Sequence, residues 1–130
     1  MIVVDASIIA SALGDDASDG ERARKRLAGE RLAAPELIDL EVASVWRRAA
    51  GAGRLEGKRA HQALADLAAL PLERAPHQPL MSRIWELREN FTPYDAAYVA
   101  LAEILEAALV TADQHLARAP AADCEIELVG

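Results

Sequence analysis

Cysteine and aromatic residues are scarce in this chain. Cys124 is the only cysteine among the 130 residues, so no disulfide can form within the chain, and nothing argues for export into an oxidising compartment. Aromatic residues make up 4% of the sequence, whereas hydrophobic residues of all kinds make up 52%. The sequence therefore predicts an aliphatic core, and its alanine-rich stretches favour helices.

Long apolar runs and a charged leader are missing as well. No apolar run approaches the roughly 20 residues needed to span a bilayer. No positively charged segment precedes the first apolar run, as it would in a secretion signal. We expect a cytoplasmic protein without membrane contact. A length of 130 residues suits one core, which would bury roughly two-thirds of the surface of the unfolded chain. We therefore expect a single domain over residues 1–130.

Basic residues are few in the second half of the chain. Residues 1–59 hold 10 Lys and Arg and 10 Asp and Glu, whereas residues 60–130 hold 4 and 11, which accounts for the whole net charge of −7. This acidic balance counts against nucleic-acid binding, because phosphate contacts need cations. Two local basic clusters in the first half soften the objection. They comprise Arg22, Arg24, Lys25 and Arg26, and Arg47, Arg48, Arg54, Lys58 and Arg59.

Short strand-like segments alternate with helical ones along the chain. Strands are predicted at residues 1–4, 31–34, 108–111 and 124–129, and a short strand or extended link at 71–76. Helices are predicted at residues 6–13, 21–28, 36–50, 56–70, 80–89, 93–106 and 113–117. This alternation implies strand–helix–strand crossovers. We therefore expect an α/β fold, a three-layer α/β/α sandwich with a mostly parallel central sheet.

The first apolar run ends abruptly on an aspartate. Ile2, Val3 and Val4 are typical of a buried strand in a parallel sheet, and Asp5 follows directly. In open α/β sheets, ligands bind outside the carboxyl ends of the strands, so chemistry is expected at Asp5. A second interpretation is that Asp5 only caps the following helix. Taken alone, Asp5 leaves both interpretations open.

A second acid lies on an apolar helix face. Glu41 has Leu37 and Val45 four residues away on either side, and a carboxylate on such a face is desolvated unless it is paired. The alternative is a glutamate at the edge of the apolar stripe that points outward. Asp39 on the same helix is the competing candidate, although its position favours a solvent-side or first-turn acid.

Two further aspartates lie where helices begin. Asp95 follows Thr92 and Pro93 in a pattern that resembles a capping box, and Asp113 follows the strand that ends at Thr111. Each of these acids, taken singly, is explained by helix capping.

The four acids together make a different case. Asp5 and Asp113 fall just beyond strand ends, and Asp95 lies at a helix start; such termini converge at one edge of a parallel sheet. With Glu41 they would form a cluster of like charges that cannot all stay ionised without counter-charge. Carboxylates are the ligands that Mg²⁺ and Mn²⁺ prefer. A carboxylate cluster holding one or two such ions is suited to phosphodiester hydrolysis.

Four segments carry a family resemblance. They are Val3–Ser7, with the order Val-Val-Asp-Ala-Ser, Pro35–Val42 with the acid Glu41, the Tyr-Asp-Ala-Ala-Tyr helix within Tyr94–Ala102, and Leu109–Asp113. Their order and spacing, over nearly the whole chain, resemble a PIN domain, and most of all the VapC toxins of bacterial VapBC toxin–antitoxin pairs. Here no acid follows shortly after Asp113, so the fifth carboxylate of some members is not expected.

The resemblance implies a metal-dependent ribonuclease. By family analogy Asp5, Glu41, Asp95 and Asp113 would ligate Mg²⁺ or Mn²⁺, and one of them would help to deprotonate the attacking water. Ser7 would be the small hydroxyl residue near the site. Thr111 would orient Asp113. Two divalent ions would change the formal net charge from −7 to −3, which weakens the electrostatic objection to RNA.

The resemblance also implies partners. The substrate would be structured RNA, such as tRNA or ribosomal RNA, cut in a single-stranded loop. A homodimer and an inhibitory VapB-like antitoxin are expected. Trp46 and Trp85 are interpreted as core residues or dimer-interface anchors. His61, His77 and His115 show no metal-ligand spacing and are interpreted as surface residues.

The sequence leaves more than one function open. Phosphatases of the haloacid dehalogenase type need a second aspartate where this chain has Ser7. They and response-regulator receivers also use a late lysine, whereas Lys25 and Lys58 are the only lysines here. A PIN-fold RNA-processing nuclease without a toxin role and an inactive PIN-like binding module both fit the pattern better. A degenerate module should have lost one of the four acids, and this chain keeps them all.

Overall fold

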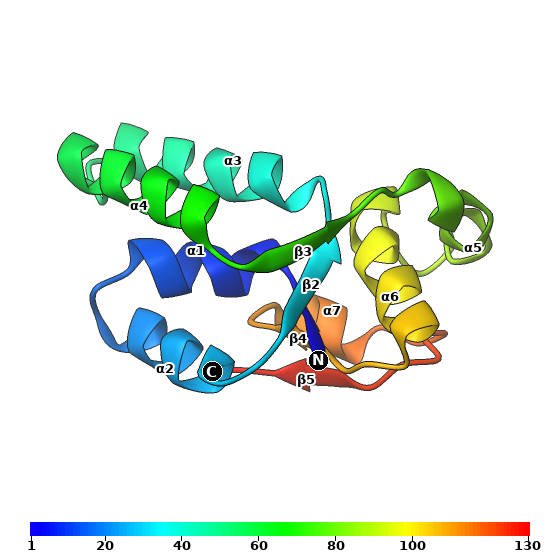
Figure 1. Cartoon of the computed structure of the whole chain (residues 1–130). Helices are drawn as coiled ribbons and strands as arrows, with labels where there is room; N and C mark the ends of the chain where they lie inside the picture. The colour runs from blue at the N-terminus through cyan, green and yellow to red at the C-terminus, as the bar shows by residue number, and fades with distance from the viewer.

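A single sheet of five short parallel strands runs through the molecule. The computed structural model describes residues 1–130, and its sheet has the order β3-β2-β1-β4-β5 (Figure 1). The strands are β1 (Ile2–Val4), β2 (Leu32–Pro35), β3 (Leu72–Ala75), β4 (Leu109–Thr111) and β5 (Ile126–Leu128). The segment predicted as a strand or a link is thus the edge strand β3. Every strand pair is parallel, as the crossovers predicted.

Helices cover both faces of this sheet. They are α1 (Ala6–Gly14), α2 (Ser18–Leu27), α3 (Ile38–Gly51), α4 (Gly57–Ala69), the 3₁₀ turn η1 (Gln78–Leu80), α5 (Met81–Glu86), α6 (Pro93–Leu105) and α7 (Gln114–Arg118). Figure 1 shows α1 to α4 on one side of the sheet and α5 and α6 on the other. The expected three-layer α/β/α fold is therefore confirmed. None of these helices is long and apolar enough to cross a membrane.

Several helix ends differ from the prediction. The third helix begins at Ile38 rather than Glu36, because the Glu36 backbone N–H still donates to the Ala75 carbonyl, 2.8 Å away, and so continues the pairing of β2 with β3. The second helix begins at Ser18, three residues earlier than predicted. Its first turn carries Asp19 and Glu21, acids that favour a helix N-terminus.

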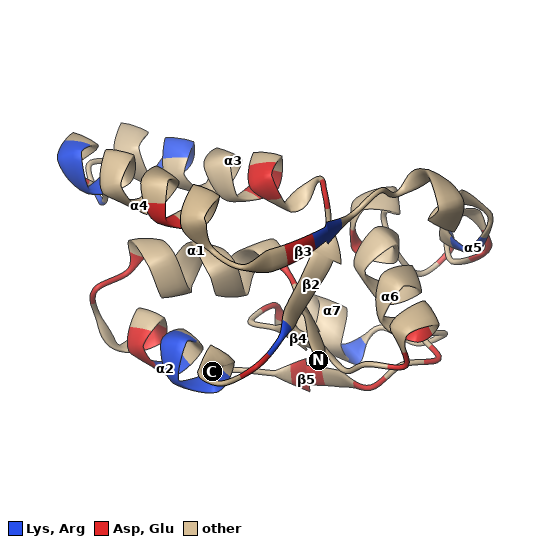
Figure 2. Cartoon of the chain, in the orientation of Figure 1, with Lys and Arg blue, Asp and Glu red and all other residues tan.

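The core is aliphatic and is centred on β1 and α6. Every residue of β1 is buried, and so is the unbroken run Ala96–Ala102 of α6. Four of these seven α6 residues are alanines, whose small side chains let the helix pack closely against its neighbours. Tyr98 is one of the few aromatic residues in this core. Figure 2 shows that the strands at the centre of the sheet carry no charged residues.

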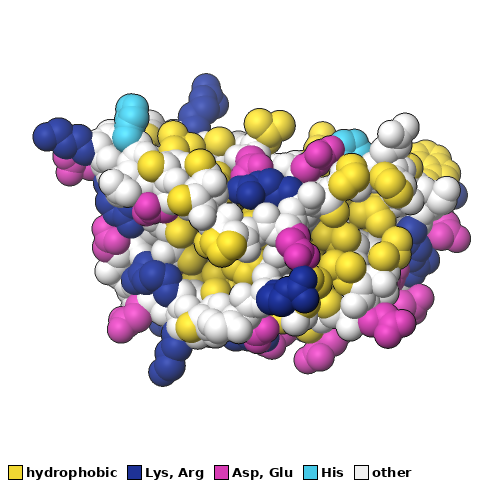
Figure 3. All heavy atoms as spheres, viewed as in Figure 1, with side chains coloured by type: hydrophobic (Ala, Val, Ile, Leu, Met, Phe, Trp, Pro, Cys, Tyr) yellow, Lys and Arg dark blue, Asp and Glu magenta, His cyan; other side chains and the backbone are white.

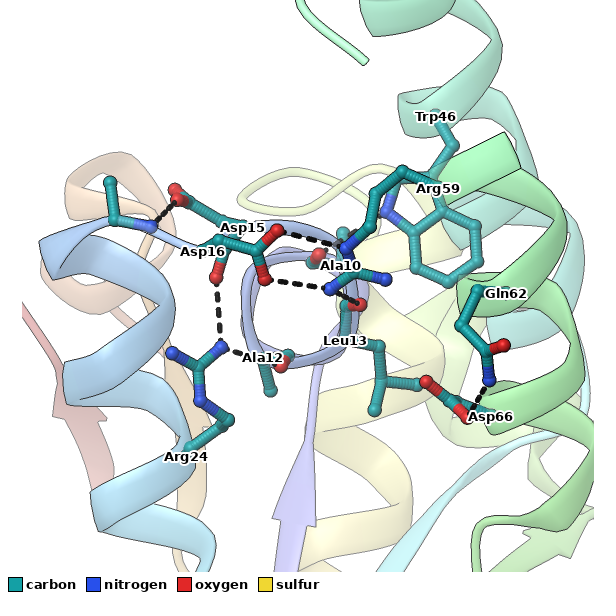
Figure 4. A network of polar contacts seen from close by, with 11 residues as sticks. Ala10, Ala12, Leu13, Asp15, Asp16, Arg24, Trp46, Arg59, Gln62 and Asp66 are labelled. Carbon is teal, nitrogen blue, oxygen red and sulfur yellow. Dashed lines mark hydrogen bonds and ion pairs between the residues drawn. The ribbon is translucent and has the colours of Figure 1, made fainter. Parts of the chain in front are cut away.

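The carboxyl end of α1 is held by side chains from three other helices (Figure 4). Arg24 of α2 donates to the carbonyls of Ala12 and Asp15, at 3.0 and 2.8 Å. Arg59 of α4 donates to the Leu13 carbonyl at 2.8 Å. Trp46 of α3 donates to the Ala10 carbonyl. Arg24 and Arg59 satisfy carbonyls at the end of the helix, where a helix leaves them unpaired, and all three donors hold in place the helix that Asp5 caps.

Candidate functional site

The four predicted acids all lie toward the carboxyl-terminal edge of the sheet. Asp5 follows β1, Asp113 follows β4, and Glu41 and Asp95 stand in the first turns of α3 and α6. The charges of Asp95 and Asp5 both act on Glu41, and that of Asp113 acts on Asp95. The fold thus brings together acids that are far apart in the sequence.

Asp5 is both a helix cap and the most deeply buried of these acids. Only 7% of its surface is exposed. Its Oδ1 accepts hydrogen bonds from the Ser7 hydroxyl at 2.6 Å and from the Ile8 backbone N–H at 3.2 Å. Its Oδ2 accepts one from the Thr111 hydroxyl at 2.5 Å. Asp5 therefore caps α1, and the same side chain lies near enough to Asp95 for that charge to raise its pKa.

Ser7 and Thr111 join α1 to the loop after β4. The Thr111 hydroxyl, which donates to Asp5, also accepts the backbone N–H of Asp113 at 3.0 Å. The Ser7 hydroxyl accepts the Ala112 backbone N–H at the same distance. Thr111 was expected to orient Asp113; the structure shows that it contacts the Asp5 carboxylate and the Asp113 backbone together. Asp113 itself is exposed, and its Oδ1 accepts the His115 backbone N–H.

Glu41 and Asp39 differ in their partners. The Glu41 carboxylate accepts a hydrogen bond from the Tyr98 hydroxyl at 2.6 Å. Asp39 instead forms a two-pronged ion pair with Arg74 of β3, with distances of 2.7 and 2.9 Å. Both oxygens of Asp39 are therefore engaged by a guanidinium, while Glu41 faces the other acids. These contacts favour Glu41 over Asp39 as the fourth member of the cluster.

Asp95 is the acid with the fewest contacts. Its backbone N–H donates to the Thr92 hydroxyl at 3.2 Å, which is the helix cap that the sequence predicted. Its carboxylate is half-buried. No hydrogen bond from the protein stabilises its charge. Both oxygens are thus available to a ligand.

Burial and mutual repulsion raise the pKa values of three acids in the cluster. Burial is the main cause of the raised pKa of Asp5. The hydrogen bonds from Ser7 and Thr111 lower this pKa, and the charge of Asp95 raises it. The pKa of Glu41 rises through burial and through the charges of Asp95 and Asp5. Burial and the charge of Asp113 raise the pKa of Asp95. No Lys or Arg offsets any of these shifts.

The donor set fits a hard divalent cation. Carboxylates without a Lys or Arg partner, in a partly buried site, are the environment in which Mg²⁺ or Mn²⁺ supplies the missing positive charge. The side chains are not gathered around one point, however, since no three His, Cys, Asp or Glu residues stand close enough together to hold an ion. The assignment of a divalent cation to this site therefore rests on the chemistry of the carboxylates and not on a formed coordination shell.

Sequence reasoning missed two residues beside these acids. Tyr98 lies three residues after Asp95 on α6, and this spacing, which puts both on one side of the helix, was the available signal. The positive charge of His115, interpreted as a surface residue, lowers the pKa of Asp95. Its place just after Asp113 could have indicated proximity to the cluster.

Trp46 is buried as a core residue, whereas Trp85 is 65% exposed.

About half of the residues in the predicted basic clusters are engaged in the protein itself. Arg22 pairs with Asp19, and Arg26 pairs with Glu30 and Glu127. Arg24 and Arg59 hold the end of α1. Figure 2 shows the remaining basic residues on α2 and around the outer end of the α3–α4 hairpin. Arg24 forms no ion pair with an acid, and the same holds for Lys25, Arg47, Arg48, Arg54 and Lys58.

A groove begins beside the cluster of acids. It has a volume of about 860 Å³ and lies between α1 and the α3–α4 hairpin. Ser7 lines one part of it, and Trp46, Arg54 and Arg59 line others. The groove touches the acidic cluster only through Ser7, so it is a neighbour of the candidate site rather than the site itself.

Comparison with known proteins identifies the family. The PIN domain model matches residues 2–122. Ribonuclease VapC9 of Mycobacterium tuberculosis is 46% identical over 129 residues, covering 99% of this chain and 98% of the relative. Ribonuclease VapC1 of the same organism is 41% identical over 128 residues, covering 98% and 96%. The crystal structure of M. tuberculosis VapC20, described as a sarcin-ricin loop cleaving toxin, has a TM-score of 0.70 at 16% identity, covering 89% and 92% of the two chains.

The structural match agrees with the parallel sheet. The chain belongs to the PIN-domain family and, within it, to the VapC ribonucleases.

Proposed function

We propose that this chain is a metal-dependent endoribonuclease that acts as the toxin of a type II toxin–antitoxin pair. It hydrolyses RNA phosphodiester bonds as a single PIN domain over residues 1–130. The observation that carries the proposal is the cluster of Asp5, Glu41, Asp95 and Asp113, in which three pKa values are raised and no Lys or Arg offsets the charge. A bound cation would stabilise the ionised form of these acids against burial and mutual repulsion.

The cofactor in this proposal is Mg²⁺ or Mn²⁺. When bound, the ion would activate water and stabilise the charge that develops on the phosphodiester oxygens. Asp5, Glu41, Asp95 and Asp113 would hold it. Ser7 and Thr111 act through Asp5, because their hydroxyls fix both of its oxygens in place. The buried side of the site also excludes water from the Asp5 carboxylate, which is only 7% exposed.

The substrate in this proposal is a structured RNA, tRNA or ribosomal RNA, in the cytoplasm. Cleavage in a single-stranded loop is favoured, because sequence-specific proteins reach unstacked RNA more readily than paired RNA. Lys25, Arg47, Arg54 and Lys58 carry no acidic partner, and Arg54 lines the groove that begins at Ser7. The flanking RNA is proposed to follow this groove, with phosphates near the free cations.

Two protein partners belong to the proposal. One is a VapB-like antitoxin, by family membership. The other is a second copy of this chain. Large apolar side chains are exposed on α3 and α5, namely Leu40 at 76%, Trp85 at 65% and Met81 at 48%. Figure 3 shows hydrophobic side chains at the surface over the α5–α6 side of the molecule. Exposed apolar surface of this kind marks interaction sites, and a homodimer would cover it.

Expression in a bacterial host tests the function. Brief induction of the chain should arrest growth, and mapping of new RNA ends should give a small set of cuts within loops. Co-expression of the small gene adjacent to its own should relieve the arrest. Discrete cuts without growth arrest, and without an effect of the neighbouring gene, would indicate an RNA-processing nuclease. The absence of any new RNA end would refute the nuclease.

A further inference from the structure

The Tyr98 hydroxyl joins α6 to the candidate site. It lies 2.6 Å from Oε1 of Glu41 on α3, across 57 positions of the sequence. Tyr98 is 1% exposed. Its ring lies within the buried run Ala96–Ala102, and all the remaining residues of this run are alanine, valine or leucine. Phenylalanine would serve the packing of this run equally well, so the hydroxyl is the feature that packing does not explain.

The Tyr98 hydroxyl has one hydrogen-bond partner, to which it donates. A phenolic O–H must donate when it is buried, and Glu41 is the acceptor. No buried side-chain nitrogen or oxygen in the chain lacks a partner. The donor is therefore satisfied only while Glu41 stays turned toward α6 and the other acids.

Glu41 depends on this contact more than Asp5 depends on any of its own. Asp5 is a short side chain held by Ser7, Ile8 and Thr111. Glu41 has one more side-chain torsion than aspartate, and the Tyr98 bond is the only hydrogen bond that acts on its carboxylate. Without it, the carboxylate would be free to turn toward solvent. With it, Oε1 is fixed and Oε2 stays available.

We propose that Tyr98 is a positioning residue, which orients the Glu41 carboxylate for a divalent cation through its hydroxyl. This proposal rests on the proposed function, because it assigns Glu41 to the metal site. It gives Tyr98 a role like that of Thr111, each presenting a hydroxyl to one acid of the cluster from a different element. Groups that orient a ligand in this way commonly change metal affinity by about 10- to 100-fold when they are removed.

Tyr98→Phe tests the proposal by Mn²⁺ binding. The variant keeps the ring and removes only the hydroxyl, so calorimetric titration of the full chain with Mn²⁺ should show about 10- to 100-fold weaker binding. Tyr94→Phe is the matched control. Tyr94 is the only other tyrosine, lies on the same helix, is 63% exposed and makes no hydrogen bond to Glu41. Its affinity should equal that of the wild type.

A second pair of variants separates positioning from a general effect on the fold. In a Glu41→Gln background the further change Tyr98→Phe should cost no additional Mn²⁺ affinity, because the group that it orients is no longer a charged ligand. Equal affinity of Tyr98→Phe and wild type, or the same loss with and without Glu41, would overturn the positioning role while leaving the nuclease intact. A wild-type chain that binds no Mn²⁺ would overturn the proposed function and this role with it.

Discussion

Thr111 donates its hydroxyl hydrogen to the Asp5 carboxylate at 2.5 Å, and so joins two residues that are 106 positions apart. Thr111 ends β4, and Asp5 follows the neighbouring strand β1. The same hydroxyl accepts the Asp113 backbone N–H. One side chain therefore sets the relative position of two acids of the cluster.

Removing the Thr111 hydroxyl should lower both the stability of the fold and the rate of RNA cleavage. Thr111→Val keeps the shape but leaves the Asp113 N–H and Asp5 Oδ2 without their partner, so urea unfolding should show a loss of about 1–3 kcal/mol. RNA cleavage should fall at least tenfold. Thr111→Ser retains the hydroxyl and should keep most of the activity. A Val variant as active as the Ser variant would show that this bond does not position Asp5.

The raised pKa of Asp5 predicts a pH dependence of stability without metal. A carboxyl group whose pKa is higher in the folded chain binds its proton more tightly there, so it favours folding at low pH. That contribution is lost as pH rises from the ordinary value of 3.8 through the raised pKa. The free energy of unfolding in EDTA should therefore fall over this range more steeply for wild type than for Asp5→Asn.

The comparison of these two chains removes the contribution of groups that the charge of Asp5 does not influence. Asp16, Glu103 and Glu127 have lowered pKa values through their arginine partners and act in the opposite direction, but equally in both chains. Asparagine is also a good helix cap, so the cap of α1 is kept. At neutral pH without metal, Asp5→Asn should be as stable as wild type or more stable. If the free energy of unfolding changed with pH in the same way in both chains, folding would not raise the pKa of Asp5.

Glu41 and Asp39 offer a matched pair of substitutions on one helix. Glu41→Gln removes a charge from the cluster and should lower Mn²⁺ affinity and RNA cleavage by at least tenfold. Asp39→Asn breaks the ion pair with Arg74, which is partly exposed, and should cost about 0.2–1 kcal/mol of stability while activity is kept. Loss of Mn²⁺ binding in Asp39→Asn alone would assign the fourth ligand to Asp39.

Gly20 allows α2 to lie against the end of α1. A Cβ at this position would stand 1.8 Å from the Asp15 carbonyl oxygen, a backbone atom. Gly20→Ala should therefore force the two helices apart and destabilise the chain by about 1–3 kcal/mol in urea unfolding. Gly51 has nothing within 4 Å of such a Cβ, so Gly51→Ala should be neutral or stabilising. Equal stability of the two variants would contradict this packing.

The fold and the convergence of the four acids at one edge of the sheet were largely predictable from the sequence, whereas the hydrogen-bond partners of these acids were not. The strand before Asp5 and the cap before Asp95 are local patterns that the structure contains. The choice between Glu41 and Asp39 depends on Tyr98 and Arg74, which lie 57 and 35 residues away. Contacts between distant segments decide between the two acids, and the periodic pattern of one helix carries no information about those contacts. The start of α3 was misplaced for the same reason, because a bond to Ala75 of β3 decides it.

Cleavage of RNA by purified wild type and Asp5→Asn, in Mg²⁺ and in EDTA, tests the central claim most directly. Wild type should cut total bacterial RNA at discrete positions in Mg²⁺ and not in EDTA. Asp5→Asn should remain folded, by circular dichroism, and cut at least 100-fold more slowly, about 2.7 kcal/mol in transition-state stabilisation. Full cleavage by a folded Asp5→Asn chain, or cleavage by wild type that persists in EDTA, would contradict the account.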